Sequence, residues 1–297
     1  MTSRNHHNEI VNVLEDSRVL RLIEETIHED LGMGDVTTEA TVPLDLRGHA
    51  EIVVKESGIL AGLEYTAQVF EIIDPEVEFK SVMNDGSFIK SGTVVASLDG
   101  VLASILKGER TALNILQRMS GIATLTRKFV DAVQGTKARI TDTRKTAPGL
   151  RILDKRAVHI GGGMNHRFGL DDMVLIKDNH ITAAGGIGVA IERCLSYVGQ
   201  KHPPLKIEVE TKNLQQVEEA LKYKGIHRIM LDNFNLDDMK KAVQLINHAV
   251  EVEASGNVML NNVRAIAETG VDFISVGALT HSPKALDISL KIVSTSS

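Results

Sequence analysis

Several residue types that other proteins rely on are scarce in this sequence of 297 residues. A single cysteine, Cys194, rules out a disulfide within one chain, and its apolar neighbours predict a buried structural thiol in a reducing cytoplasm. There is no tryptophan, and aromatic residues make up only 3% of the chain, so few side chains could stack on nucleic-acid bases. No apolar run approaches the roughly 20 residues of a bilayer-spanning helix. These absences predict a cytoplasmic protein that binds neither nucleic acid nor a membrane.

Positive charge is concentrated in one stretch of an otherwise acidic chain. Residues 139–177 hold eight Lys or Arg and four Asp, whereas the whole sequence has a formal charge of −6. A basic segment in an acidic protein predicts a site for a small, highly charged anion. Its candidate ligands sit beside predicted strands or glycines: Arg144, Lys145, His166, Arg167 and Lys177. The cations of a predicted helix are expected only to be solvated: Arg151, Lys155 and Arg156.

The first part of the chain predicts a small domain that is rich in β-structure. Residues 16–31 place apolar side chains at helical spacing, and a second helix is expected near 62–73. Between about 46 and 106 the chain consists of short β-rich runs, which are separated by Asn-Asp-Gly, Ser-Gly and Asp-Gly turns. This pattern favours an α+β domain.

Residues 108–134 predict a further helix, with a break at Ser120–Gly121. Arg110 lies near the predicted start of this helix, where a cation is unfavourable beside the positive end of the helix dipole. We therefore expect Arg110 to bind a ligand.

After residue 137, strands and helices alternate regularly. Six strands are expected, at 138–143, 172–178, 205–210, 227–233, 249–255 and 272–278, and helical patterns lie between them at 150–159, 182–198, 213–224, 235–248 and 261–269. The later strand ends recur every 22 or 23 residues, which is typical of a βα repeat with short loops. A doubly wound sheet is the alternative, and it is disfavoured because no G-x-G-x-x-G turn opens the first unit.

The predicted architecture is therefore α/β, with three parts. Residues 1–122 form a small N-terminal α+β open-sandwich domain with a leading helix, and residues 123–278 form an irregular or incomplete α/β barrel. Residues 279–297 are expected to form a C-terminal amphipathic helix that packs back on the N-terminal domain.

Polar residues follow the predicted strands at their carboxyl ends, which in α/β barrels lie together at the rim where active sites form. The cations named above come from the first two strand ends and suit carboxylates. Glu210 and Asp232 are acceptors that suit Mg²⁺ or ribose hydroxyls. Backbone N–H groups at Ser255-Gly256-Asn257 and at Gly277-Ala278 can bind a phosphate. Because no P-loop, Cys/His metal spacing or Ser-His-Asp order is present, we expect catalysis by positioning and electrostatics.

The chain resembles the quinolinate phosphoribosyltransferase family over nearly its whole length. The most specific motifs are DTRKTAPGLR at 142–151, GGGMNHRFGL at 161–170 and IKDNH at 176–180. The resemblance implies a pentosyltransferase of NAD biosynthesis, which transfers phosphoribose from phosphoribosyl pyrophosphate to quinolinate and forms nicotinate mononucleotide, pyrophosphate and CO₂. It also implies Mg²⁺ that arrives with phosphoribosyl pyrophosphate, and a homodimer in which Arg110 acts in the partner's site.

The resemblance also implies a role for each matching position. The catalytic residues are Lys145, Glu210 and Asp232. The substrate-binding residues are Arg110, Thr143, Arg144, Lys145, Thr146, His166, Arg167, Lys177, Glu210, Asp232, Ser255, Gly256, Asn257, Val276, Gly277 and Ala278. Glu210 and Asp232 are also implied to hold Mg²⁺, either directly or through water or substrate. Asn257 departs from the family pattern, in which we expect Gly at this position in many members.

Three alternatives remain at this point. A nicotinate phosphoribosyltransferase-like enzyme would use similar substrates without releasing CO₂. A carrier or sensor domain is suggested by the segment NDGSFIKSGTVVASLDG, which resembles lipoyl and biotinyl carrier domains although it displays no lysine at a hairpin tip. An aldolase-like lyase would form a Schiff base on Lys177, but the surroundings of that lysine suit anions.

Overall fold

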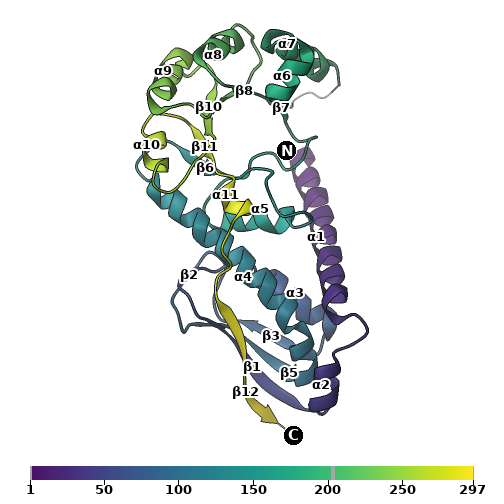
Figure 1. Ribbon diagram of the computed structural model, residues 1–297. Coiled ribbons are helices and arrows are strands. Elements are labelled where there is room, and N and C mark those ends of the chain that lie inside the picture. The colour runs from purple at the N-terminus through teal and green to yellow at the C-terminus, as the bar shows by residue number, and fades with distance from the viewer. Residues whose placement is uncertain (1, 202–204, 297) are drawn as a thin grey trace. The chain divides into compact units, whose positions relative to one another are not determined.

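The computed structural model describes residues 2–201 and 205–296, and the chain folds into two compact units (Figure 1). Unit 1 contains residues 1–125, 147–161 and 283–297, and unit 2 contains residues 126–146 and 162–282. Residues 147–161, which sequence reasoning placed with the barrel, thus belong with the N-terminal part of the chain.

Unit 1 is built on an antiparallel sheet with the strand order β12-β1-β5-β3. Its strands are β1 (Arg47–Val54), β3 (Glu78–Ser81), β5 (Val94–Val101) and β12 (Ile288–Ser296). Two short strands, β2 (Gly58–Ile59) and β4 (Phe88–Ile89), pair separately. Every second residue of β1 is buried, which is typical of a sheet with one face on a core and the other toward solvent. The predicted α+β character of this part is confirmed.

The helices of unit 1 are α1 (Thr2–Leu31), α2 (Val36–Thr41), α3 (Leu63–Ile73), α5 (Arg151–Ile160) and most of α4 (Leu102–Ala132). Figure 1 shows α3 and α4 across one face of the sheet. The core beneath them includes Phe70, which is fully buried and stacks on Phe79 with ring centroids 6.0 Å apart. Gly108 lets α4 approach α3, because a Cβ at that position would lie 2.8 Å from the Phe70 ring.

The predicted helix break at Ser120–Gly121 is wrong, because both residues lie inside α4. Their small side chains instead allow close packing. The Ser120 hydroxyl accepts the Ala61 backbone N–H at 3.0 Å, and a Cβ on Gly121 would lie 2.1 Å from the carbonyl oxygen of Lys284. The same helix begins at Leu102, so Arg110 lies two turns inside it and not at its start.

The predicted C-terminal helix is also wrong. Residues 288–296 form β12, which pairs antiparallel with β1 from Val54–Ile288 to Arg47–Ser296. The sequence ISLKIVSTS is rich in β-branched residues, and it pairs with β1 along its whole length apart from a register shift between His49 and Ala50. The tail thus does pack on the N-terminal domain, as an added strand.

Unit 2 contains a parallel sheet of six strands in the order β6-β11-β10-β9-β8-β7. The strands are β6 (Arg139–Thr141), β7 (Val174–Ile176), β8 (Ile207–Thr211), β9 (Arg228–Asp232), β10 (Glu251–Ser255) and β11 (Phe273–Ser275). All six predicted strands are confirmed. β6 and β7 form the edges, and β6 is extended by a parallel bridge between Thr141 and Met164. This arrangement is compatible with the expected irregular or incomplete barrel.

Helices follow the strands of this sheet, as the βα repeat predicts. They are α6 (Asp178–Ala184), α7 (Ile187–Lys201), α8 (Leu214–Leu221), α9 (Leu236–Ile246), α10 (Val263–Ala267) and α11 (Ala278–His281). The single helix expected at 182–198 is in fact two, because Gly185 and Gly186 adopt positive φ angles between α6 and α7. Among the residues that the structure describes, no single helix is long and apolar enough to cross a membrane, although α6 and α7 pass that test together across a 93° bend.

Candidate active site

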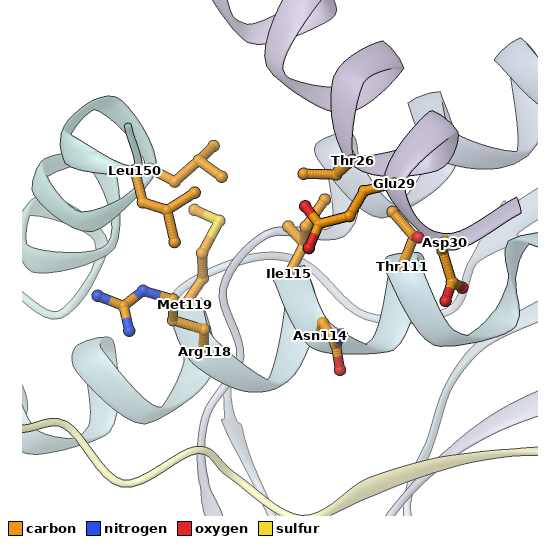
Figure 2. A pocket seen from close by; sticks show the side chains of 10 residues that line it. Thr26, Glu29, Asp30, Thr111, Asn114, Ile115, Arg118, Met119 and Leu150 are labelled. Carbon is orange, nitrogen blue, oxygen red and sulfur yellow. The ribbon is translucent and has the colours of Figure 1, made fainter. Parts of the chain in front are cut away.

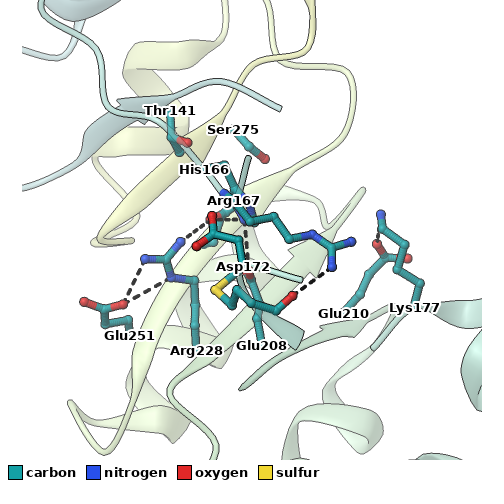
Figure 3. Close-up of polar contacts among 12 residues, drawn as sticks. Thr141, His166, Arg167, Asp172, Lys177, Glu208, Glu210, Arg228, Glu251 and Ser275 are labelled. Atoms are coloured by element: carbon teal, nitrogen blue, oxygen red, sulfur yellow. Dashed lines mark hydrogen bonds and ion pairs between the residues drawn. The ribbon is translucent and has the colours of Figure 1, made fainter. Parts of the chain in front are cut away.

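Charged residues line one face of the sheet in unit 2. Glu208 and Glu210 alternate along β8, so both side chains point to the same face. In the register of the sheet, Arg228 of β9 lies between Glu208 and Glu251, and Asp232 lies beside Ser255. Side chains from three neighbouring strands therefore converge, as Figure 3 shows.

Two fully buried carboxylates, those of Glu208 and Glu253, occupy the centre of this face. Arg228 donates from Nη1 to Glu253 Oε2 at 2.7 Å, and its Nε and Nη2 donate to Glu251 Oε2 at 3.2 and 2.9 Å. The Arg228 guanidinium also stacks on the Phe273 ring at 3.8 Å from the centroid. Arg228 is therefore held from several sides, and it fixes Glu253 in turn.

Burial raises the pKa of both central carboxyl groups. The pKa of Glu208 rises from 4.5 to about 7 because its charge is desolvated, although nearby Arg228 opposes this. The pKa of Glu253 also rises to about 7, because of burial and then because of the neighbouring Glu208. Each group uses only Oε2 for hydrogen bonds in the described part of the chain, while its Oε1 atom is buried without a partner. Both carboxyl groups therefore release their protons less readily than exposed carboxyl groups do.

His166 lies against this pair, below the rim where sequence reasoning expected it. Its Nε2 atom is 2.9 Å from Glu208 Oε2 and 3.5 Å from Glu253 Oε2, and 6% of its side chain is exposed. Its Nδ1 atom accepts the backbone N–H of Arg167 at 2.8 Å. Because Nδ1 is an acceptor, the ring proton lies on Nε2, which donates to Glu208. His166 is therefore a neutral, buried link, and the cationic donor that sequence reasoning expected is not what this geometry favours.

His166, Glu208 and Glu253 also lie close enough together to hold a metal ion, with ligand atoms within 4.8 Å of one another. The hydrogen bonds argue against this use. A metal would require a bare Nε2, yet that atom carries the ring proton, and Arg228 already neutralises Glu253. These three residues do not fit a metal site.

Arg167 and Arg144 bring two cations to the same part of the rim. Arg167 is 9% exposed and donates from Nη1 to the Met173 carbonyl at 2.9 Å. Burial lowers the pKa of Arg167, and the adjacent charge of Arg144 lowers it further, while Glu208 and Asp172 act in the opposite direction. Two guanidinium groups at one place on the rim suit an anion.

Lys177 and Glu210 lie at adjacent strand ends and form an ion pair, with Nζ 2.9 Å from Oε2 (Figure 3). The Glu210 side chain is 9% exposed, whereas 45% of Lys177 faces solvent. Lys177 also precedes the first residue of α6. The predicted cation and the predicted acceptor are therefore brought together by the fold.

The loops that follow β9 and β10 both contain backbone in the left-handed region. Asn233, Gly256 and Asn257 have φ angles of 57°, 95° and 51°. The Asn257 amide donates to Asn233 Oδ1 at 3.0 Å, and the Asn233 amide donates to Asp232 Oδ2 at 3.1 Å. The positive φ at Asn257 explains why glycine suits this position, and why Asn is a tolerated substitute. Since α10 begins only at Val263, any phosphate-binding N–H groups here belong to a turn and not to a helix end.

The ends of β6 and β11 also meet. A Cβ on Gly277 would lie 3.2 Å from the Lys145 side chain and 3.2 Å from the His281 ring, so glycine leaves room for both. The Thr280 hydroxyl donates to the Lys145 carbonyl at 2.9 Å, and Thr143 accepts the Lys145 N–H at 3.0 Å. These contacts place the exposed Lys145 beside the Gly277-Ala278 turn, where a phosphate and a cation are expected together.

Unit 1 contains a cavity of about 310 Å³ among α1, α4 and residues near the start of α5 (Figure 2). Glu29 and Asp30 of α1 line it together with Thr111, Asn114 and Arg118 of α4. Its two carboxylates have the wrong sign for an anionic substrate, so the rim of unit 2 remains the candidate active site.

Two family descriptions match almost the whole chain. "Quinolinate phosphoribosyl transferase, N-terminal domain" matches residues 35–120, and "Quinolinate phosphoribosyl transferase, C-terminal domain" matches residues 122–291. A relative from Synechocystis sp., named a probable carboxylating nicotinate-nucleotide pyrophosphorylase, is 49% identical over 276 residues, which cover 91% of each sequence. The chain belongs to the quinolinate phosphoribosyltransferase family.

Further similarity to this family is found in plants and in solved structures. The chloroplastic nicotinate-nucleotide pyrophosphorylase of Arabidopsis thaliana is 48% identical over 286 residues, which cover 91% of this chain and 82% of the relative. The structure of the nicotinate-nucleotide pyrophosphorylase from Francisella tularensis superposes with a TM-score of 0.88 at 39% identity, covering 93% of this chain and 96% of that one. Human nicotinic acid phosphoribosyltransferase, at 13% identity and a TM-score of 0.59, shares the fold alone.

The other predicted residues of this quinolinate phosphoribosyltransferase family member are distributed as follows. Thr143, Thr146, Ser255, Val276 and Ala278 lie at the same strand ends of unit 2, with Val276 fully buried. Arg110 lies in unit 1 and is exposed on α4. Lys155 was expected to be solvated, and this is wrong: it is 2% exposed, whereas its neighbour Arg156 does face solvent.

Sequence reasoning missed four charges beneath the rim: the buried Asp142, Glu208 and Glu253, and Arg228, whose side chain is 13% exposed. A signal for three of them was present. In the runs LKIEVE, HRIMLD and AVEVEAS, charged residues alternate with apolar ones inside strands that a parallel sheet buries on both faces. Charges at such positions require partners, and they could have been paired with one another across the predicted sheet.

Proposed function

We propose that this enzyme transfers phosphoribose from phosphoribosyl pyrophosphate to the ring nitrogen of quinolinate and releases pyrophosphate and CO₂. The product is nicotinate mononucleotide, so the reaction belongs to NAD biosynthesis. The names of the Synechocystis and Arabidopsis relatives, both carboxylating nicotinate-nucleotide pyrophosphorylases, support this function. At the level of the site, the proposal rests chiefly on the adjacent Arg144 and Arg167 at the rim.

Quinolinate carries two neighbouring carboxylates, and the cations at the first two strand ends suit them. Each Arg offers a planar fork that can bind one carboxylate through two hydrogen bonds. Burial and, after it, the charge of Arg144 lower the pKa of Arg167, and a dianion bound between the two residues would favour the charged form of Arg167. Lys145 and Lys177, together with Thr143 and Thr146, would bind the remaining anionic groups of the two substrates.

Glu210 and Asp232 would hold the ribose hydroxyls and stabilise the cationic character that the ribose develops as pyrophosphate departs. They lie at the ends of adjacent strands, and the Glu210 carboxylate is nearly buried, so its charge acts in a poorly solvating environment. The 5′-phosphate would bind to the backbone at Ser255, Gly256 and Asn257, and beside Val276, Gly277 and Ala278. The left-handed turn at Gly256 supports this role because it directs successive N–H groups to one side.

Mg²⁺ fits this site as a companion of phosphoribosyl pyrophosphate. Glu210 and Asp232 offer hard carboxylate oxygens, as Mg²⁺ prefers, but one oxygen of each already accepts a hydrogen bond. Because the two carboxylates have few free oxygens, substrate phosphates and water would supply the remaining ligands of Mg²⁺. Bound Mg²⁺ would neutralise charge on the departing pyrophosphate.

The residues of the chain then position the acceptor for attack. With both carboxylates held, the ring nitrogen faces the anomeric carbon, and the C–N bond forms as the C–O bond to pyrophosphate breaks. The ring becomes cationic, so it accepts the electron pair left when CO₂ departs from the neighbouring carbon. A proton from solvent then replaces the carboxyl group, and no side-chain base is required.

A homodimer with Arg110 in the partner's site is the assembly that we propose for this family member. Arg110 is exposed two turns inside α4, where the helix dipole gives no reason to prefer a cation. Arg110→Ala should therefore weaken quinolinate binding. Mixing this variant with a Lys145→Ala variant should restore part of the activity, because a mixed dimer would contain one intact site; no recovery would contradict the shared site.

A cytoplasmic location remains our proposal and is supported by the lone Cys194. Relatives that are similar in sequence include proteins named as mitochondrial and as chloroplastic. Fractionation of cells followed by immunodetection would decide between these compartments.

The direct test of function is release of labelled CO₂ from 2-carboxyl-labelled quinolinate in the presence of phosphoribosyl pyrophosphate and Mg²⁺. We expect label release that is matched by nicotinate mononucleotide formation. Nicotinate as acceptor should give no such turnover. Folded protein that uses nicotinate and ignores quinolinate would show that the decarboxylating function is wrong.

A further inference from the structure

His166 joins the buried interior of the sheet to the segment that carries Arg167. One ring nitrogen, Nε2, donates to Glu208 at 2.9 Å and lies 3.5 Å from Glu253. The other, Nδ1, accepts the backbone N–H of Arg167 at 2.8 Å. Because neutral imidazole carries one proton, the partner of one nitrogen decides what the other can do.

The carboxylates that face Nε2 are rigidly held. Glu253 Oε2 accepts from Arg228 Nη1 at 2.7 Å, and Arg228 is fixed by Glu251 and by the Phe273 ring. Glu208 and Glu253 are both 0% exposed. Burying two carboxylates costs free energy that an apolar pair of similar volume would avoid, so a functional reason for them is expected.

The segment around His166 is anchored on its other side as well. The His166 backbone N–H donates to Asp142 at 2.8 Å, and Met164 forms a parallel bridge with Thr141 at the end of β6. The ring is therefore held between β6 and β8, and the Arg167 backbone is held by the ring. From this backbone the long side chain reaches the rim beside Arg144.

Loss of the acceptor at Nε2 would disturb this chain of contacts. The ring would be free to carry its proton on Nδ1, where it would meet the Arg167 N–H, and two donors cannot occupy positions 2.8 Å apart. The Arg167 backbone would have to move. Even a displacement of about 1 Å at a substrate-binding group can reduce activity roughly a hundredfold.

We propose that Glu208 and Glu253 are positioning residues for the binding of quinolinate. They hold His166 as its Nε2–H tautomer, and His166 thereby holds Arg167 where its guanidinium binds a quinolinate carboxylate. This inference rests on the proposed function for the identity of the ligand. Glu208, Glu253 and His166 would thus raise the affinity for quinolinate without touching it.

The first test compares Glu208→Met, which removes the acceptor that faces Nε2, with the control Glu268→Met, which changes an exposed carboxylate at the end of α10 that pairs with Arg264. We expect Glu208→Met to raise the Kd and KM for quinolinate about tenfold, the equivalent of one charge-assisted hydrogen bond. The KM for phosphoribosyl pyrophosphate should not change, and Glu268→Met should leave both values unchanged. Equal effects of the two variants, or equal losses for both substrates, would show a general effect on the fold.

A second test places Glu208→Met in a His166→Asn background. The Asn side-chain oxygen can accept the Arg167 N–H in place of Nδ1, and the variant has no Nε2 atom that needs a carboxylate. If Glu208 acts through His166, its substitution should have no further effect on quinolinate affinity in this background. The same tenfold loss in both backgrounds would overturn the proposal.

The tautomer itself can be read without any substrate. In the ¹⁵N spectrum of the imidazole groups, His166 should show a protonated Nε2 and a bare Nδ1, and Glu208→Met should shift protonation toward Nδ1. Glu208→Leu provides the same readout if Glu208→Met fails to fold. A protonated Nδ1 in the unmodified protein would refute the positioning role, whereas absence of CO₂ release together with the expected tautomer would refute only the proposed function.

Discussion

Lys177 and Glu210 bind each other, with Nζ donating to Oε2 at 2.9 Å. Sequence reasoning assigned Lys177 to the acceptor and pyrophosphate, and Glu210 to the ribose. Because each residue is the other's partner before substrate binds, occupation of one subsite changes the charge that the other subsite presents. The two substrates are therefore expected to influence each other's binding through this pair.

Replacing Lys177 by Met should show what the Lys177–Glu210 pair contributes to stability and to substrate binding. It leaves the nearly buried Glu210 carboxylate without its cation, so the unfolding free energy should fall by about 1 kcal/mol, as for partly exposed ion pairs. Affinity for anionic substrate should fall as well. Thermal unfolding and calorimetry with quinolinate measure the two effects, and an unchanged unfolding temperature would show that the pair contributes no stability.

Arg167→Ala should weaken quinolinate binding by roughly 1.5–3 kcal/mol, since it removes charge-assisted hydrogen bonds to a carboxylate. The fold should persist, because the Arg167 backbone contact to His166 remains possible. Arg156→Ala is the control: this residue lies in the same basic segment but faces solvent on α5. Comparable losses in calorimetric titrations of the two variants would indicate a diffuse charge effect and not a specific contact.

Gly121→Ala should destabilise unit 1 by several kcal/mol, on the order of the larger single-site effects. The added Cβ would lie 2.1 Å from the Lys284 carbonyl oxygen, which belongs to backbone and cannot rotate away. Gly199→Ala in helix α7 is the matched control, because no atom lies within 4 Å of its new Cβ. That variant should gain roughly 0.5–1 kcal/mol from helix propensity. Thermal unfolding should thus shift in opposite directions for the two variants.

Glu253 predicts a pH dependence of stability. Burial, with the neighbouring Glu208, raises its pKa from 4.5 to about 7, so between these values the folded protein keeps a proton that the unfolded chain has lost. The free energy of unfolding therefore falls as the pH rises through this window, and the contribution is complete below pH 4.5 and lost above about 7. Denaturant titrations at about pH 5.5 and about pH 8 should show a smaller decline for Glu253→Gln, because an amide does not ionise. An identical decline would exclude Glu253 as its source.

The strands of unit 2 could be predicted from sequence because they are short apolar runs at regular spacing, each ending in a polar residue. The rim residues Glu210, Asp232 and Ser255 follow directly from that spacing. The two errors in unit 1 have another origin. At Ser120–Gly121, small residues indicated a break, but the space they provide is filled by a segment more than 150 residues later in the chain. No local pattern contains that information.

The orientation of His166 could not be predicted for a similar reason. Its place beside Arg167 and after glycines suggested a rim cation, whereas contact with Glu208, 42 residues away, makes it a buried neutral link. The burial of Lys155 and the strand β12 likewise depend on packing partners that are distant in sequence. Local pattern thus placed the candidate residues at the strand ends, and tertiary contacts decided which of their side chains are buried.

The pairing of β1 with β12 has a consequence for how the protein is made. During synthesis, β1 can pair with β5 as soon as residue 101 has emerged, but β12 follows residues 162–282 of unit 2. Until those residues have left the ribosome, β1 keeps an open edge of unpaired N–H and C=O groups, which invites pairing with other chains. The nascent chain is therefore most vulnerable to aggregation while unit 2 is being translated, and a chaperone that shields this edge would act in that interval.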